Sequence, residues 1–169
     1  SIGGQVSVPT AVVGGHRFRA ITVGGQHTCA IDLDGQPWCW GGDVLPLGDD
    51  GVSRSALPVR IAGSPPLVDI ITGTWAACGR TSGGAVYCWG INGYGEMGIK
   101  PSGLNTRFDT AQRMSSSLRW VQVGGEVTTF CGVDHGDAVW CWGYGVFGEL
   151  GPVHQSSSEP VRIEGVQGA

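Results

Sequence analysis

Six cysteines are the residues of this chain whose spacing most clearly predicts chemistry. They form three pairs with nine residues between the two members of each pair: Cys29 and Cys39, Cys78 and Cys88, Cys131 and Cys141. A structural zinc site normally has cysteines about two to four residues apart, and a redox-active dithiol has a Cys-x-x-Cys motif beside a helix. Neither pattern occurs here, so the spacing favours disulfide bonds over a metal site or a redox centre.

Each cysteine pair brackets a turn that brings its two members together. If the first pair occupies opposed positions of two antiparallel strands, residues 33–35 form a three-residue hairpin loop, and Gly35 takes the position that favours a positive φ. Gly84 holds this position in the second pair, and Asp137, which tolerates it less well than glycine, holds it in the third. Opposed residues in a non-hydrogen-bonded pair are close enough for a disulfide. We therefore predict three hairpin disulfides and an oxidising location, which is extracellular, at the cell surface or periplasmic.

The cysteine pairs belong to a repeat of about 50 residues, which is typical of propeller blades. The motif CWG recurs with Trp40, Trp89 and Trp142, and each copy is followed by a glycine-rich turn, GDVLPLG, INGYGEMG or YGVFGELG. Each copy then closes on a strand, PVRI, AQRM or PVRI, and no segment has a helical period. We predict an all-β fold, a single β-propeller segment over residues 1–169. Its three four-stranded blade units are residues 17–63, 67–116 and 118–165.

The aromatic residues fit the same repeat. Side chains alternate across a strand, so the CWG tryptophans point to the face opposite the cysteine and are expected to pack against the next blade. The repeated pairs are Trp40 and Gly41, Trp89 and Gly90, and Trp142 and Gly143. By contrast, Trp38, Trp75 and Trp120 lack a counterpart in every unit, so they are candidates for an exposed surface.

No motif in the sequence predicts catalysis, a metal site or a cofactor. The four histidines do not recur in the three units, and the chain has no G-x-S-x-G motif. Asp49 and Asp50 lie in a glycine-rich stretch, but their spacing does not fit an EF-hand calcium loop. Glu96 and Glu149 are separated by one repeat, so we interpret them as caps of equivalent turns rather than as the carboxylate pair of a glycosidase.

The charge of the chain argues against a nucleic-acid partner. The formal net charge is -4, and the ten basic residues are scattered, whereas nucleic-acid binding requires a basic surface. No apolar run approaches the roughly 18 to 20 residues that span a bilayer. We expect neither nucleic-acid binding nor a membrane span.

The stretch GGQHTCAIDLDGQPWCWG and the turns GYGEMG and FGELG resemble the regulator of chromosome condensation repeat. The resemblance extends over nearly the whole chain and is strongest in the first unit. In the later units His27 is replaced by Trp75 and Val127, and the glutamine of the family's turn is Glu96 and Glu149 here. The cysteine pairs are similar to those of a secreted bacterial subset of this family.

The resemblance implies a propeller of about seven blades, so three units do not close a ring. Residues 6–15, VSVPTAVVGG, resemble the closing strand of a preceding blade. We therefore expect an ordered part of a larger propeller, or a propeller that self-association or another chain completes.

The resemblance also implies a rigid scaffold that presents loops to a protein partner. We expect a non-enzymatic, secreted or periplasmic binding module, such as an accessory subunit of a larger assembly, with contacts in the loops at 43–56, 99–110 and 152–159. The alternatives are a carbohydrate or cell-wall binding module that uses exposed tryptophans, and a hydrolase or lyase on a propeller scaffold. The candidate binding residues are Trp75, Trp120, Asp49, Asp50, Lys100, Arg107 and His154.

Overall fold

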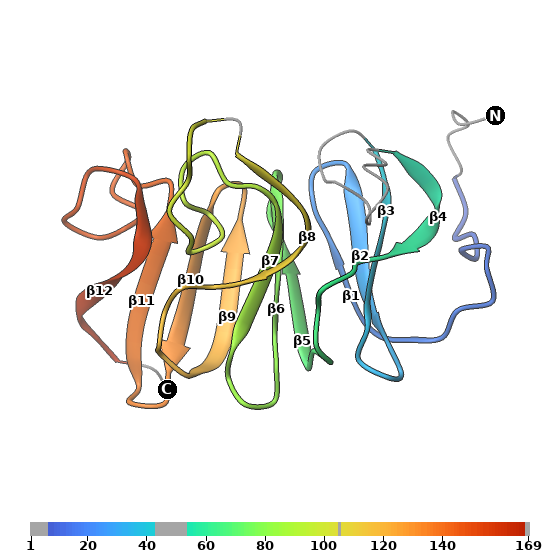
Figure 1. The fold of residues 1–169 in the computed structure, drawn as a ribbon, viewed down its shortest axis with the longest axis horizontal. Coiled ribbons are helices and arrows are strands. Elements are labelled where there is room, and N and C mark those ends of the chain that lie inside the picture. The colour runs from blue at the N-terminus through green and yellow to red at the C-terminus, as the bar shows by residue number, and fades with distance from the viewer. Residues whose placement is uncertain (1–6, 43–53, 105, 168–169) are drawn as a thin grey trace.

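The described part of the protein is built around three similar antiparallel sheets. The computed structural model describes residues 7–42, 54–104 and 106–167. Within these ranges the chain forms twelve strands and no helix, and so no helix that is long and apolar enough to cross a membrane. Figure 1 shows the sheets standing side by side in chain order. The predicted all-β fold with three four-stranded units is confirmed.

Each sheet contains four strands that follow one another along the chain, and we call the sheets units 1, 2 and 3. Unit 1 consists of β1 (Phe18–Val23), β2 (His27–Asp32), β3 (Pro37–Gly41) and β4 (Ser55–Arg60). Unit 2 consists of β5 (Asp69–Thr72), β6 (Ala76–Arg80), β7 (Val86–Ile91) and β8 (Arg107–Arg113). Unit 3 consists of β9 (Trp120–Glu126), β10 (Thr129–Asp134), β11 (Ala138–Gly143) and β12 (Ser157–Gln167).

The central hairpin of each unit has the register that the cysteine spacing predicts. In all three units the first cysteine lies directly opposite the second. The loop residues Gly35, Gly84 and Asp137 have φ values of 84°, 76° and 59°. All three cysteine pairs form disulfides, so this prediction is confirmed.

An aspartate side chain holds the hairpin loop in units 1 and 3. One carboxylate oxygen of Asp32 accepts the backbone N–H of Gln36, and the other accepts the indole N–H of Trp38, both at 2.8 Å. Asp134 accepts equivalent bonds in unit 3, and the backbone N–H of Ala138 is the main cause of its lowered pKa. The indole of Trp38 is thus tied to its own sheet.

The hydrophobic core lies between neighbouring units. Trp89 of unit 2 belongs to the core cluster that contains the disulfide of unit 1, and Trp142 of unit 3 belongs to the cluster that contains the disulfide of unit 2. Each of these tryptophans therefore packs against the preceding unit, not the next one as the sequence suggested. Trp40 is only half-buried, because the described residues form no sheet before unit 1 that could cover it.

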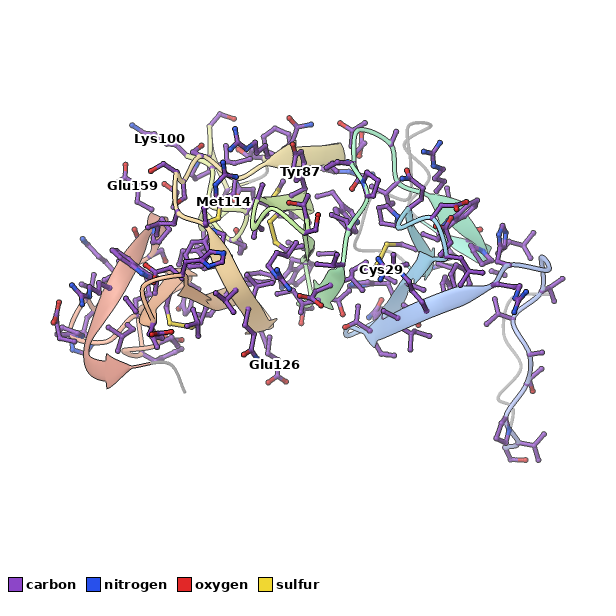
Figure 2. The ribbon with its side chains drawn as sticks, turned by 90° about the horizontal axis from the view of Figure 1, so that it is seen from below. Cys29, Tyr87, Lys100, Met114, Glu126 and Glu159 are labelled. Atoms are coloured by element: carbon purple, nitrogen blue, oxygen red, sulfur yellow. A yellow bond between two sulfur atoms is a disulfide. The ribbon has the colours of Figure 1, made fainter. Side chains whose placement is uncertain are left out.

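The repeated topology gives the molecule an inner side and a loop-bearing edge. The first strands of neighbouring units contact each other, β1 with β5 and β5 with β9, and these strands form the inner side. Figure 2 shows Glu126, at the end of β9, on this side and Lys100 on the opposite side. In an antiparallel sheet, the turn after the first strand and the loop after the third lie at the same edge. We call it the upper edge, and it lies at the top of Figure 1: residues 24–26, 73–75, 92–104, 127–128 and 144–156.

Residues 7–15 form no strand and are exposed to solvent. They include most of the segment 6–15, which we predict to be the closing strand of a preceding blade. Among the described residues no sheet is available for it to pair with, so the assignment stays a prediction.

Candidate functional site

Three large apolar side chains converge on a small pocket at the upper edge. Trp75 is 40% exposed, Tyr94 is 42% exposed and Leu104 is 69% exposed. They surround a hollow of about 200 Å³, which we call the Trp75 pocket, lined by Trp75, Ile91, Gly93, Tyr94, Glu96 and Leu104. Exposed apolar side chains that gather around a hollow are typical of interaction sites, whereas single ones are normal on any surface.

The walls of the pocket come from three segments that hydrogen bonds and close contacts hold together. The carbonyl of Trp75 accepts the backbone N–H of Ile91 at 2.8 Å, which fixes the tryptophan beside the end of β7. Gly93 lies so close to Leu104 that a Cβ there would be 2.5 Å from the carbonyl oxygen of that leucine. Only glycine therefore lets the loop before β8 close over the turn. The side chain of Asn92, which is fully buried, donates to the carbonyl of Ile99 at 2.7 Å and holds the same loop.

Glu96 forms the base of the pocket and is 1% exposed. Its carboxylate accepts the backbone N–H of Tyr94 at 2.8 Å, and burial raises its pKa. Glu149 makes the equivalent bond to the N–H of Phe147 in unit 3, also at 2.8 Å. The interpretation of both glutamates as turn caps is confirmed by these bonds. The carbonyl of Glu96 also accepts the indole N–H of Trp142 at 2.9 Å, which joins the turn to the next unit.

A larger hollow of about 710 Å³ opens on unit 3 beside Cys131, Tyr144, Phe147 and Glu149. The repeat explains it. Phe147 occupies the position of Tyr94 in unit 2, where Tyr144 of the next unit packs at 5.0 Å between ring centroids. The larger hollow therefore corresponds to a face that the following unit covers in the other two sheets, so we assign it to packing between blades.

Of the predicted binding residues within the described ranges, Trp75 lines the small pocket at the upper edge. Lys100 and His154 are exposed in loops of the upper edge, and Arg107 forms an ion pair with Asp109 at 2.8 Å. None of these three basic residues lines the Trp75 pocket. Two further candidates, Asp49 and Asp50, and most of the loop 43–56 lie outside the described residues.

The expectation that Trp120 is exposed is wrong. Its side chain is 1% exposed, and its ring centroid lies 5.2 Å from that of Trp142. As the first residue of β9 it enters the core between units 2 and 3, so it is not available for stacking on a ligand.

Sequence reasoning missed Tyr94 and Leu104 as parts of the site. A signal for the first was present, because an aromatic residue stands at the same place of two glycine-rich turns, as Tyr94 and as Phe147. Large apolar side chains in such turns have no sheet to pack against and are therefore candidates for an exposed surface. No comparable pattern marked Leu104, whose position depends on how its loop folds back over Gly93.

The strand register corrects the alignment of His27 with the later units. His27 lies opposite Gly41, and the residues that lie opposite the equivalent glycines are Ala76 and Thr129. The replacements are therefore alanine and threonine, not Trp75 and Val127. His27 is 2% exposed, and neither ring nitrogen has a hydrogen-bond partner within the described part of the chain. Burial lowers its pKa to about 4, which keeps the folded-state ring neutral at pH 7.

His27 should make stability depend on pH. An unfolded chain has a histidine pKa near its ordinary value of about 6.5, so between that pH and about 4 the unfolded state binds a proton that the folded state does not. The free energy of unfolding is expected to fall as the pH is lowered through this range. Urea midpoints measured across this pH range should decline less steeply for His27→Ala than for the parent protein. Alanine is the residue that unit 2 has at the equivalent position. An unchanged slope would show that His27 is not the group responsible.

Within the described ranges, no group of three or more His, Cys, Asp or Glu residues is placed to hold a metal ion. The charged residues that line the two hollows are Glu96 and Glu149, which cap turns, and Glu126 at the end of β9. The geometry therefore supports recognition of a ligand more directly than it supports a reaction.

The repeated sheets define the class of protein. Three four-stranded antiparallel units, packed face to face through tryptophans and joined in chain order, are blades of a β-propeller. Residues 18–44 and 68–96 match the Regulator of chromosome condensation (RCC1) repeat. The repeat that the sequence resembles is thus matched in unit 1 and in unit 2.

Similar proteins share the fold over most of this chain. It is 31% identical to the human E3 ubiquitin-protein ligase HERC2 over 162 residues, which are 88% of this chain and 3% of the relative. In a crystal structure of Kap60 bound to yeast RCC1 (Prp20), the similar chain gives a TM-score of 0.76 at 20% identity, with 88% of this chain and 37% of that chain covered. The structure of Prp20p from Saccharomyces cerevisiae gives a TM-score of 0.74 at 21% identity, with 88% of this chain and 38% of that chain covered. The chain thus spans well under half the length of these relatives.

Proposed function

We propose that the protein is a non-enzymatic scaffold that binds another protein through its upper edge. The Trp75 pocket carries this proposal, because its three exposed apolar walls lie on the edge that also bears the loops of the units. Aromatic anchors beside a pocket dominate the binding energy of many protein interfaces, and loops on a rigid framework are common recognition elements. The disulfide in each hairpin and the tryptophans between units supply the rigid framework.

Relatives with the same fold support a protein partner. Yeast RCC1 (Prp20) is described as bound to Kap60, and Prp20p is described by its binding properties to Gsp1p and histones. We do not extend these particular partners to this chain, because the likeness is 20% to 21% in sequence.

We also propose that the protein works in an oxidising location, secreted, at the cell surface or in the periplasm. All six cysteines are paired, and disulfides of this kind persist where thiols are not kept reduced. Alkylation and mass spectrometry of the protein from its native source should find no free thiol. Full alkylation without prior reduction would contradict the proposed location.

Affinity capture from the native source tests the scaffold proposal. The oxidised protein is expected to retain a stoichiometric protein partner, and Trp75→Ala should reduce its recovery about tenfold or more, because the variant removes the largest wall of the pocket. The matched control is Leu33→Ala, which removes an exposed apolar side chain from a hairpin loop at the opposite edge. Equal capture by the Trp75 variant would contradict the site, and recovery of no partner by the parent protein would contradict the function.

A carbohydrate or cell-wall ligand is the second candidate, and the exposed ring of Trp75 supports it. The burial of Trp120 removes the other tryptophan on which that hypothesis depended. A glycan array with the oxidised protein and Trp75→Ala distinguishes the two candidates, since a sugar ligand should give hits that the variant loses.

We propose that further blades, in the same protein or another chain, cover the two open ends of the segment. The half-buried Trp40 and the larger hollow on unit 3 support this, because the equivalent surfaces between units are closed. We keep the unit boundaries 17–63, 67–116 and 118–165 and the preceding-blade strand 6–15 as parts of the same proposal. A stable monodisperse monomer of 17.5 kDa in solution would contradict it.

A further inference from the structure

We propose that the Trp75 pocket takes a single basic side chain, arginine or lysine, from the protein partner. This inference rests on the proposed function and adds the chemistry of the group that is recognised. It depends on the size of the pocket, the nature of its walls and the charge at its base.

The pocket is sized for one side chain. Its volume of about 200 Å³ is below the range of about 300 to 1,000 Å³ that is usual for small-molecule and cofactor sites. It also belongs to unit 2, which has a neighbouring unit on both sides, so no further blade would fill it as one would fill the larger hollow. The occupant is therefore a group that a partner inserts from above the upper edge.

The walls favour a side chain with an apolar stem and a cationic end. Trp75 and Tyr94 present aromatic surface, and tryptophan is the strongest aromatic partner for a cation. Leu104 offers aliphatic surface to the methylene groups by which lysine and arginine approach a protein. A purely apolar side chain would pack against these walls equally well. The carboxylate of Glu96 at the bottom of the pocket therefore decides between an apolar and a basic side chain.

The bottom of the pocket carries a carboxylate, and no basic residue lines the pocket within the described part of the chain. Among the described residues that line the pocket, Glu96 is the only charged one, and its carboxylate is bound by backbone N–H groups, including that of Tyr94 at 2.8 Å, rather than by a cation. Burial raises the pKa of Glu96, because the loss of hydration outweighs the backbone N–H groups that favour its charged form in the free protein. A cation in the pocket would stabilise the charged form further. The net charge of -4 also favours the approach of a basic partner.

Nuclear magnetic resonance titration of the oxidised protein with N-acetyl-arginine amide tests the proposal. The Trp75 indole signal is expected to shift in a saturable way, and N-acetyl-citrulline amide, which has the same shape without the charge, should bind at least about tenfold more weakly. N-acetyl-phenylalanine amide probes the apolar alternative. Equal binding of the arginine and citrulline compounds, stronger binding of the phenylalanine compound, or no saturable shift would overturn the proposal.

Two matched variants separate the role of the charge from that of the fold. Glu96→Gln retains an oxygen that can accept the N–H of Tyr94, so it should keep the turn intact and weaken binding of the arginine compound about tenfold. Glu149→Gln makes the same change in the equivalent turn of unit 3, where no tryptophan stands opposite, and should leave binding unchanged. Equal effects of the two variants would contradict the proposal. Partner capture that depends on Trp75 but not on Glu96 would retain the scaffold function and reject the basic side chain.

Discussion

Replacing Trp142 by alanine is expected to lower the free energy of unfolding by about 3 to 5 kcal/mol. Trp142 is fully buried between units 2 and 3, with its ring centroid 5.2 Å from that of Trp120. Its indole N–H donates to the carbonyl of Glu96 at 2.9 Å. The variant would leave a cavity at the interface and remove this link between the units. Urea unfolding followed by tryptophan fluorescence and by circular dichroism measures the loss.

The matched control is Trp40→Ala, because Trp40 holds the same place in the CWG motif of unit 1. It is half-buried and stacks on Phe18 at 5.7 Å between ring centroids, without a preceding unit to cover it. We expect this variant to cost roughly 1 to 2 kcal/mol. If both variants cost the same, then Trp40 is covered in solution, which would indicate association through the open end of unit 1.

Removing the disulfide of unit 2 should have an effect of similar size. In Cys78→Ala/Cys88→Ala, the unfolded chain loses a cross-link between residues ten positions apart, which costs about 3 kcal/mol in the chain-entropy model. Both cysteines are fully buried in the cluster that contains Trp142, so the loss of packing adds to this cost. Non-reducing urea unfolding of the variant and the parent protein gives the difference.

The disulfide of unit 3 provides the comparison, because Cys131 and Cys141 are also ten positions apart. The entropic part of the two effects should therefore be equal. Cys131 is only half-buried at the open face of unit 3, so Cys131→Ala/Cys141→Ala should cost less than the unit 2 variant. A larger loss for the unit 3 variant would mean that burial between units does not stabilise the cystine.

The repeat made the fold predictable, because local patterns recur with the same meaning in each copy. The cysteine spacing gave the hairpin register, and the turn chemistry gave a positive φ at Gly35, Gly84 and Asp137, all from residues close together in sequence. Hairpins depend on short-range geometry, so no tertiary information was needed for them. The error with His27 arose because its counterparts in the later units were not counted from the cysteines, which set the strand register in all three units.

The candidate site was only partly predictable, because burial depends on what covers a side chain. Trp75 and Trp120 looked alike in the sequence, since neither recurs in every unit. Trp75 lies beyond the end of β5 at the upper edge and is therefore exposed. Trp120 is the first residue of β9, inside the interface between units, and is therefore buried. Alternation along a strand gives the face of a side chain but not the unit that lies against that face.

The sequence by itself determined the class of fold, the number of units and the pairing of the cysteines, because each follows from a period or a turn within a single hairpin. The tertiary structure decided which unit each tryptophan packs against and that Leu104 folds back beside Trp75 and Tyr94. These contacts join segments of different strands and units. Their geometry is set by the way whole sheets pack, and sheet packing has no short-range signature in the order of residues.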